Sequence, residues 1–159
     1  MWWRISRKEL ESNKSEGNRN AMHALVLGGT VPGILAYEKN QAIGWCAIAP
    51  RRDLHSLNRS RILKPLDERT VWSITCFYVD KLHRNSGLVK QLIQAAVLHA
   101  KKNGARIVEA YPHTPVDERA APVTAYMGFP GAFEQCGFSV ERQASKSKLI
   151  MRHYIEETR

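Results

Sequence analysis

Cysteine is scarce in this chain. Cys46, Cys76 and Cys136 are the only three among 159 residues, and no two of them form a Cys-x-x-Cys pair. An odd number with that spacing argues against a disulfide scaffold and against a zinc knuckle, so we expect no metal site. Cys46 and Cys76 lie inside apolar runs, which favours small core residues over nucleophiles.

Long hydrophobic runs are also missing. No segment approaches the length that crosses a bilayer, and the first residues, MWWRISRKEL, lack the apolar stretch of a signal peptide. The sequence has no internal repeat and no low-complexity tract. With 43% hydrophobic and 25% charged residues, the composition is that of a single globular domain over residues 1–159. We therefore expect a cytoplasmic protein that does not insert into membranes.

Acidic residues are outnumbered, and one stretch has none. The chain carries 24 Lys and Arg against 15 Asp and Glu, a formal net charge of +9, and no acidic residue lies between Lys81 and Val108. Such a balance favours polyanions: nucleic acid, an anionic membrane surface or a phosphate-bearing cofactor. Taken alone, the basic stretch is also consistent with an ordinary solvated face.

The periodicity of the apolar residues predicts an α/β order of elements. Residues 71–79 (VWSITCFYV) have the composition of a strand buried on both faces. A helix with one apolar stripe begins near Leu88 and ends at Asn103-Gly104, and residues 106–111 form the next strand, which completes a βαβ unit.

Outside this unit, the remaining predicted elements are a strand remnant at 1–5, a helix over 7–27 broken by Gly17, a hairpin of strands 32–37 and 42–49, a short helix within 54–61, a short helix starting at Pro130, and closing strands at 138–143 and 148–154. Residues 50–70 and 112–129 are long connections. Loops of that length in a compact domain often form binding sites or lids.

The loop between the buried strand and the helix carries the chemistry. It reads His83-Arg84-Asn85-Ser86-Gly87-Leu88-Val89. A tight turn with glycine at a helix entrance leaves backbone N–H groups unpaired, and the helix dipole adds positive potential there. Arg84 can add a charge-assisted bond, so the loop suits a pyrophosphate.

This stretch resembles the acetyl-CoA-binding segment of the GNAT superfamily of N-acetyltransferases, which carries Arg/Gln-x-x-Gly-x-Gly/Ala. Arg84 and Gly87 match, and Val89 stands where the family prefers Gly or Ala. The order of elements and the segment FPGAFEQCGF extend the resemblance over nearly the whole chain, to a bacterial subgroup without a well-defined substrate. In that subgroup the chain usually starts earlier.

The resemblance implies a GNAT acyl-CoA N-acyltransferase fold, with a mixed, mostly antiparallel sheet and helices on both faces. It implies that two central strands splay apart and admit the pantetheine arm of acetyl-CoA. The residues expected to bind acetyl-CoA are Phe77, Tyr78, Val79, Arg84, Asn85, Ser86, Gly87, Leu88 and Val89. Transfer would be direct, with a backbone N–H near Phe77–Val79 stabilising the thioester oxygen.

Several residues are candidates for proton transfer. Glu109, an acidic residue in the apolar run IVEAY, is the first candidate for the base, although it could equally face solvent or pair with a lysine. Asp80 is the second, with capping of the phosphate loop as the alternative. The resemblance places a catalytic tyrosine of many relatives at Phe133, which cannot donate a proton, so either solvent protonates the departing thiolate or another residue does, such as Tyr126 or Tyr78.

We therefore expect an acyltransferase that moves acetyl from acetyl-CoA to an amine of an unidentified acceptor. The alternatives are a non-catalytic acyl-CoA-binding or sensor module of the same fold and, less favoured, a basic nucleic-acid-binding protein. The resemblance makes a homodimer plausible, and residues 50–70 are expected to shape the choice of acceptor.

Overall fold

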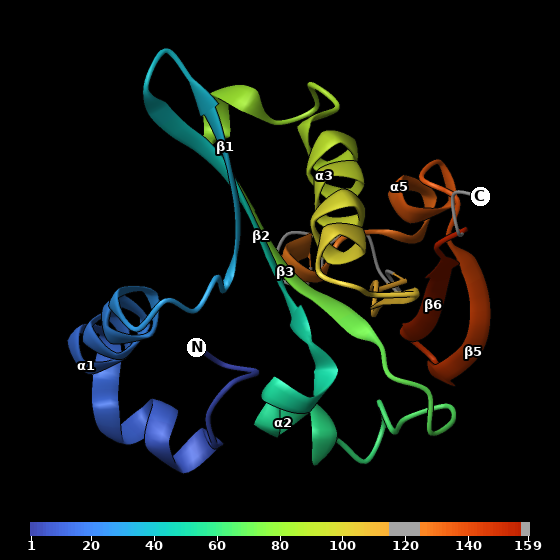
Figure 1. The fold of residues 1–159 in the computed structure, drawn as a ribbon, viewed down its shortest axis with the longest axis horizontal. Coiled ribbons are helices and arrows are strands. Elements are labelled where there is room, and N and C mark those ends of the chain that lie inside the picture. Colours follow the sequence, from blue (N-terminus) through green and yellow to red (C-terminus); the bar gives the residue numbers. More distant parts are fainter. Residues whose placement is uncertain (115–124, 157–159) are drawn as a thin grey trace.

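The computed structural model describes residues 1–114 and 125–156. Its central element is a six-stranded mixed sheet (Figure 1). Its strand order is β1-β2-β3-β4-β6-β5. The β3–β4 pair is parallel and the other neighbouring pairs are antiparallel, as expected from the sequence. The strands are β1 (Gly33–Glu38), β2 (Gln41–Pro50), β3 (Trp72–Val79), β4 (Ile107–Ala110), β5 (Ser139–Ser145) and β6 (Lys148–Tyr154).

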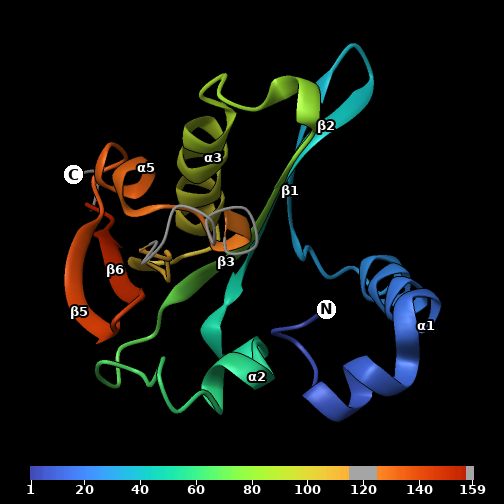
Figure 2. The same ribbon diagram turned by 180° about the vertical axis from the view of Figure 1, so that it is seen from behind.

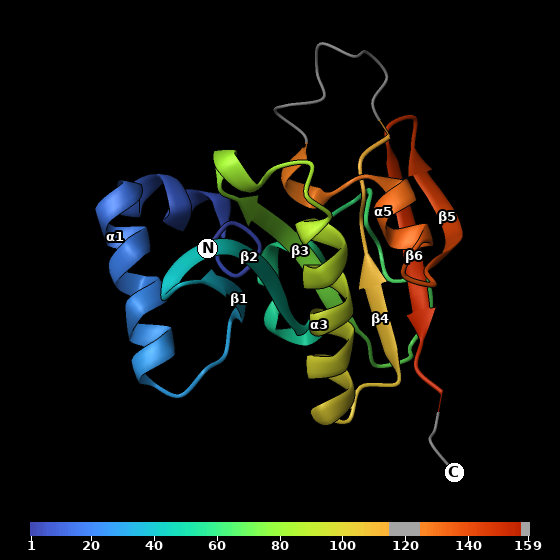
Figure 3. The same ribbon diagram turned by 90° about the horizontal axis from the view of Figure 1, so that it is seen from above.

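The expected βαβ unit is present as β3, helix α3 (Leu88–Lys102) and β4. The apolar stripe of α3, which includes Leu92, Ile93 and Ala96, is buried in the main core cluster. Close packing depends on Gly44 of β2, because a Cβ there would lie 3.1 Å from a methyl carbon of Leu88. Helix α5 (Pro130–Glu134) lies on the same face of the sheet as α3 (Figure 3).

The opposite face of the sheet is covered by α2 (His55–Asn58) and the chain around it. Leu54, Leu57 and Leu63 pack there in a second core cluster that also contains Tyr111 and Ile150. Helices therefore lie on both faces, and the expected fold class is confirmed.

Helix α1 (Arg7–Leu27) lies near the β1 edge, at the opposite end of the sheet from the β5–β6 hairpin (Figures 1 and 2). It begins with a capping box in which the Ser6 and Glu9 side chains bond each other's backbone N–H groups. The predicted break is real but misplaced. The chain kinks at Lys14, whose φ is 52°, and Gly17 continues the helix.

The strand predicted over residues 1–5 does not form. The backbone turns instead, with the N–H of Arg4 donating to the carbonyl of Met1 at 2.8 Å. The carbonyls of Trp3 and Ile5 accept from the Ser56 N–H and hydroxyl on α2. These bonds satisfy the segment without a sheet partner, which is why its aromatic composition did not produce a strand.

The parallel pair separates after three residues. Residues 72–74 of β3 pair with residues 108–110 of β4, and β4 ends there, whereas β3 continues to Val79. On its other side β3 stays paired with β2 up to Val79. Among the described residues, the edge of β3 that faces away from β2 therefore has no strand partner along its last residues, as the resemblance implied.

Candidate functional site

A cavity of about 510 Å³, here called the loop cavity, lies at this open edge. It is lined by Phe77, Tyr78, Val79, His83, Arg84, Asn85, Gly87, Leu88, Val89, Tyr126, Gly128, Phe129 and Ala132. Eight of the nine residues expected to bind a donor line it. Ser86 does not; its hydroxyl donates to the carbonyl of His83 and stabilises the turn.

The turn before α3 has the backbone geometry of an anion site. Asn85 and Gly87 both have left-handed φ values, 60° and 81°, and no side chain caps the N-terminus of the helix. Unpaired N–H groups at such a start attract anions, and the helix dipole adds to the attraction. A Cβ on Gly87 would meet nothing within 4 Å, so the space beside it is open.

Cationic side chains flank the turn. Arg84 lines the loop cavity, and its Nε lies 3.5 Å from the carbonyl of Val79. The His83 imidazole lies between Glu38 and Asp80, at 3.3 and 3.4 Å, and these carboxylates raise the pKa of His83, Glu38 contributing most. Arg84 favours a phosphate ligand at the turn.

Asp80 caps the short 3₁₀ helix Lys81–His83. Its carboxylate accepts from the Leu82 N–H at 2.9 Å, and this bond, with the one to His83, lowers the pKa of Asp80. Asp80 does not line the loop cavity. Its contacts favour the capping alternative over proton transfer.

A second cavity, here called the tryptophan cavity, has a volume of about 360 Å³. It is lined by Met1, Trp2, Trp3, Arg4, Met22, Pro32, Trp45, Ala47, Leu54, Thr75, Cys76 and Tyr126. Tyr126 lines both cavities, so they adjoin at that ring. Tyr126 is 41% exposed, and partial burial, with a smaller contribution from Cys76, raises the pKa of Tyr126.

Sequence reasoning missed most of the tryptophan cavity. Residues 1–5 were expected to form a strand remnant. The available signal was the cluster of aromatic side chains beside an arginine at the start of the chain, Trp2-Trp3-Arg4. Nothing in the linear sequence indicates that Trp45 and Tyr126 join them.

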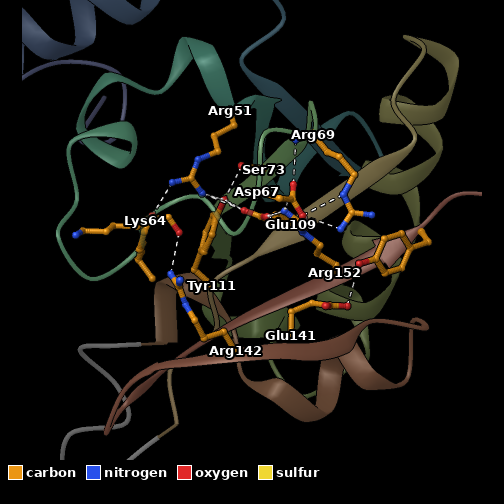
Figure 4. A network of polar contacts seen from close by, with 12 residues as sticks. Arg51, Lys64, Asp67, Arg69, Ser73, Glu109, Tyr111, Glu141, Arg142 and Arg152 are labelled. Atoms are coloured by element: carbon orange, nitrogen blue, oxygen red, sulfur yellow. Dashed lines mark hydrogen bonds and ion pairs between the residues drawn. The ribbon is translucent and has the colours of Figure 1, made fainter.

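Glu109 lies elsewhere, in a buried network on the α2 face of the sheet (Figure 4). Its Oε1 accepts from Arg51 at 3.0 Å and from the Tyr111 hydroxyl at 2.7 Å, and its Oε2 accepts from Arg152 at 2.8 Å. Arg152 also pairs with Asp67 at 2.6 Å. Both oxygens of Glu109 are thus held by donors, and Glu109 lines neither cavity. This arrangement favours a structural role.

Phe133 is fully buried and packs against Phe77 and Phe138, with ring centroids 5.9 and 5.1 Å away. It lines neither cavity.

None of the helices in the described ranges is long and apolar enough to cross a membrane. Residues 1–114 and 125–156 also contain no group of three or more His, Cys, Asp or Glu that could hold a metal ion.

Solved structures similar to this fold include yncA from Salmonella typhimurium with its cofactor acetyl-CoA, at 19% identity and TM-score 0.56, covering 89% of this chain and 74% of that one. The PaiA N-acetyltransferase from Thermoplasma acidophilum in complex with coenzyme A aligns at 16% identity and TM-score 0.53, covering 95% and 80%. The ribosomal-protein-alanine N-acetyltransferase from Brucella melitensis aligns at 15% identity and TM-score 0.54, covering 88% and 78%.

Those likenesses show the fold alone, and no curated protein matches the chain significantly. The sequence profile of the acetyltransferase (GNAT) family matches residues 1–129, a span that includes the turn at Gly87 and the whole βαβ unit. With that match and the shared fold, this chain belongs to the acetyltransferase (GNAT) family.

Proposed function

We propose that this protein is an N-acetyltransferase that transfers the acetyl group of acetyl-CoA directly to an amine. One observation carries the proposal. The loop cavity joins an anion-binding turn to the open edge of β3 and adjoins a second cavity at Tyr126. A donor and an acceptor can therefore meet beside one strand.

The residues of the loop cavity fit acetyl-CoA. The N–H groups at the start of α3, with Arg84, would hold the diphosphate. The open edge of β3 at Phe77, Tyr78 and Val79 would pair with the amides of the pantetheine arm as an added strand does. Asn85, Leu88 and Val89 complete the wall, and Ser86 holds the turn in shape.

The thioester supplies an activated acetyl group, and the chain supplies positions for the reacting groups. The amine nitrogen bonds to the acetyl carbon as the carbon–sulfur bond breaks, and the Tyr126 hydroxyl donates its proton to the sulfur. Tyr126 then regains a proton from water, which balances the proton that the amine loses. A backbone N–H of β3 stabilises the charge that develops on the carbonyl oxygen. The described residues that line the tryptophan cavity include no carboxylate and no imidazole. In this mechanism the proton of the amine leaves through water.

The test is isothermal titration with acetyl-CoA of the wild type, Gly87→Trp and Gly104→Trp. Both glycines have a φ of 81° and open space where a Cβ would lie, but Gly104 follows the C-terminal end of α3. The two variants therefore carry the same backbone strain. We expect Gly87→Trp to weaken binding by at least about 100-fold, because the indole fills the diphosphate site, and Gly104→Trp to leave it unchanged.

Equal binding by both variants, or no binding by the wild type, would contradict the proposed donor site. Tight binding without release of CoA toward any amine would leave a non-catalytic acyl-CoA-binding module. Steeply salt-dependent binding of DNA or RNA that survives Gly87→Trp would favour the nucleic-acid-binding alternative.

A further inference from the structure

The walls of the tryptophan cavity are almost entirely apolar. Trp2, Trp3 and Trp45 come from two separate parts of the chain, and Met22 and Leu54 add aliphatic surface. The Trp2 and Trp3 rings meet edge to face, with centroids 6.1 Å apart. Such a lining binds a large apolar side chain, because its burial removes apolar surface from water on both partners.

Among the described residues that line this cavity, only Arg4 has a charged side chain. Its Nη2 donates to the carbonyl of Pro32 at 3.2 Å, and among the described residues no carboxylate lies within ion-pair distance of it. Burial lowers the pKa of Arg4, and the more distant Asp53 offsets this only in part. A half-buried guanidinium without an anionic partner gains from a ligand that brings a carboxylate.

The same lining argues against cationic acceptors. Polyamines and aminoglycosides carry several ammonium groups, and a site for them needs carboxylates. The described lining residues of this cavity have none, and the chain as a whole carries a net charge of +9. Arg4 would repel a second positive charge on the acceptor.

The reactive end of the cavity is fixed by Thr75, Cys76 and Tyr126, which lie on or beside β3, where the loop cavity begins. Resting on the proposed function, we propose that the acceptor is a free α-amino acid with a large apolar side chain. Its carboxylate pairs with Arg4, its side chain lies among the tryptophans, and its amine faces β3 near Tyr126. The nitrogen–acetyl bond forms as the carbon–sulfur bond breaks, giving an N-acetylamino acid and CoA.

The test compares each amino acid with the amine that lacks only the carboxylate. L-phenylalanine is paired with 2-phenylethylamine and L-leucine with 3-methylbutylamine, and spermidine and a tetrapeptide with N-terminal phenylalanine complete the panel. CoA release is measured at saturating acetyl-CoA. We expect kcat/KM for the amino acids to exceed that for their paired amines, for spermidine and for the peptide by at least about tenfold.

Three variants locate the source of that preference. Arg4→Gln should lower kcat/KM for L-phenylalanine about tenfold and leave 2-phenylethylamine within about twofold, whereas Arg4→Lys should retain part of the preference. Arg52→Gln, an exposed arginine that does not line this cavity, should change neither. Thermal melting of each variant reports whether it folds, and the unaltered rate with 2-phenylethylamine is a second check.

A higher kcat/KM for spermidine, for the peptide or for the paired amines than for the amino acids would overturn the proposal. It would also be overturned if Arg4→Gln lowered kcat/KM equally for an amino acid and for its paired amine. Direct titration of L-phenylalanine, without acetyl-CoA, separates this inference from the function on which it rests. Failure to bind acetyl-CoA would remove the proposed function. Failure to bind L-phenylalanine in an Arg4-dependent manner would remove the amino acid site.

Discussion

The two ends of β3 lie in opposite environments. At its start β3 is paired with β4, and Ser73 stands directly opposite Glu109 in the register. The side chains of both are buried and bonded to the Tyr111 hydroxyl. Toward its end β3 runs on without β4, and cavities lie beside it. The strand β3 thus contributes to a buried polar cluster near its start, the sealed end, and, a few residues later, to the walls of two cavities, the open end.

The sealed end supports the open end. Arg51 donates to Glu109 and to the carbonyl of Leu63, and Asp67 pairs with Arg152, so the buried network holds residues 51–67 against the sheet. Leu54 belongs to that segment and lines the tryptophan cavity. The expectation that residues 50–70 shape acceptor choice now has a physical basis, although it stays a prediction.

The largest expected effect concerns the sealed end. Glu109→Gln removes the carboxylate that pairs with buried Arg51 and shares buried Arg152 with Asp67, so we expect the free energy of unfolding to fall by about 3–5 kcal/mol. Urea denaturation measures this loss, and acetyl-CoA affinity at a temperature where the variant is folded should stay within about twofold of the wild type. Glu141→Gln, on the exposed edge strand β5, is the matched control and should cost less than about 0.5 kcal/mol.

This variant also decides between the two roles of Glu109. If Glu109→Gln had near-normal stability but a much lower kcat, Glu109 would be the catalytic base, and the sealed end of β3 would take part in the reaction. A large loss of stability with normal kcat per folded molecule would place Glu109 in the scaffold alone.

The second prediction concerns the open end. Tyr126→Phe keeps the ring that separates the two cavities and removes the proposed acid, so kcat should fall roughly 100-fold. Acetyl-CoA affinity, measured by titration, should change little, because the hydroxyl is not part of the diphosphate site. Tyr37→Phe, on the exposed β1 strand, is the control. A change in acceptor KM with unchanged kcat would make Tyr126 a wall of the cavity and not the acid.

Local patterns predicted the open end well. The apolar strand, Gly87 at the helix entrance and the stripe of α3 are features of consecutive residues, and each appears where expected. The hairpin turn at Lys39-Asn40 is another such feature, since both residues adopt the left-handed conformation. Such elements follow from propensity and spacing within one segment.

Long-range contacts could not be predicted in the same way. Glu109 is read correctly as an acid in an apolar run, but its partners Arg51 and Arg152 lie 58 and 43 residues away. The turn at residues 1–5 depends on Ser56, and the left-handed Lys14 interrupts α1 at a residue with no special propensity for it. These features arise from tertiary contacts that no local pattern records.

The smallest expected effect concerns the ion pairs of His83, which join the turn of the loop cavity to strand β1. His83 bonds Glu38, at the end of β1, and Asp80, before the loop, and both raise its pKa in the folded state. The imidazolium therefore stabilises the fold fully below the ordinary histidine pKa of about 6.5, and this contribution is lost as the pH rises through the raised value. His83→Gln should be less stable than the wild type at about pH 5.5 and equally stable well above the raised pKa. Urea denaturation across that range measures the difference, with His23→Gln on the exposed part of α1 as control. A difference that stays constant with pH would show that His83 acts through packing, and that the Glu38–His83–Asp80 bridge does not hold the loop by charge.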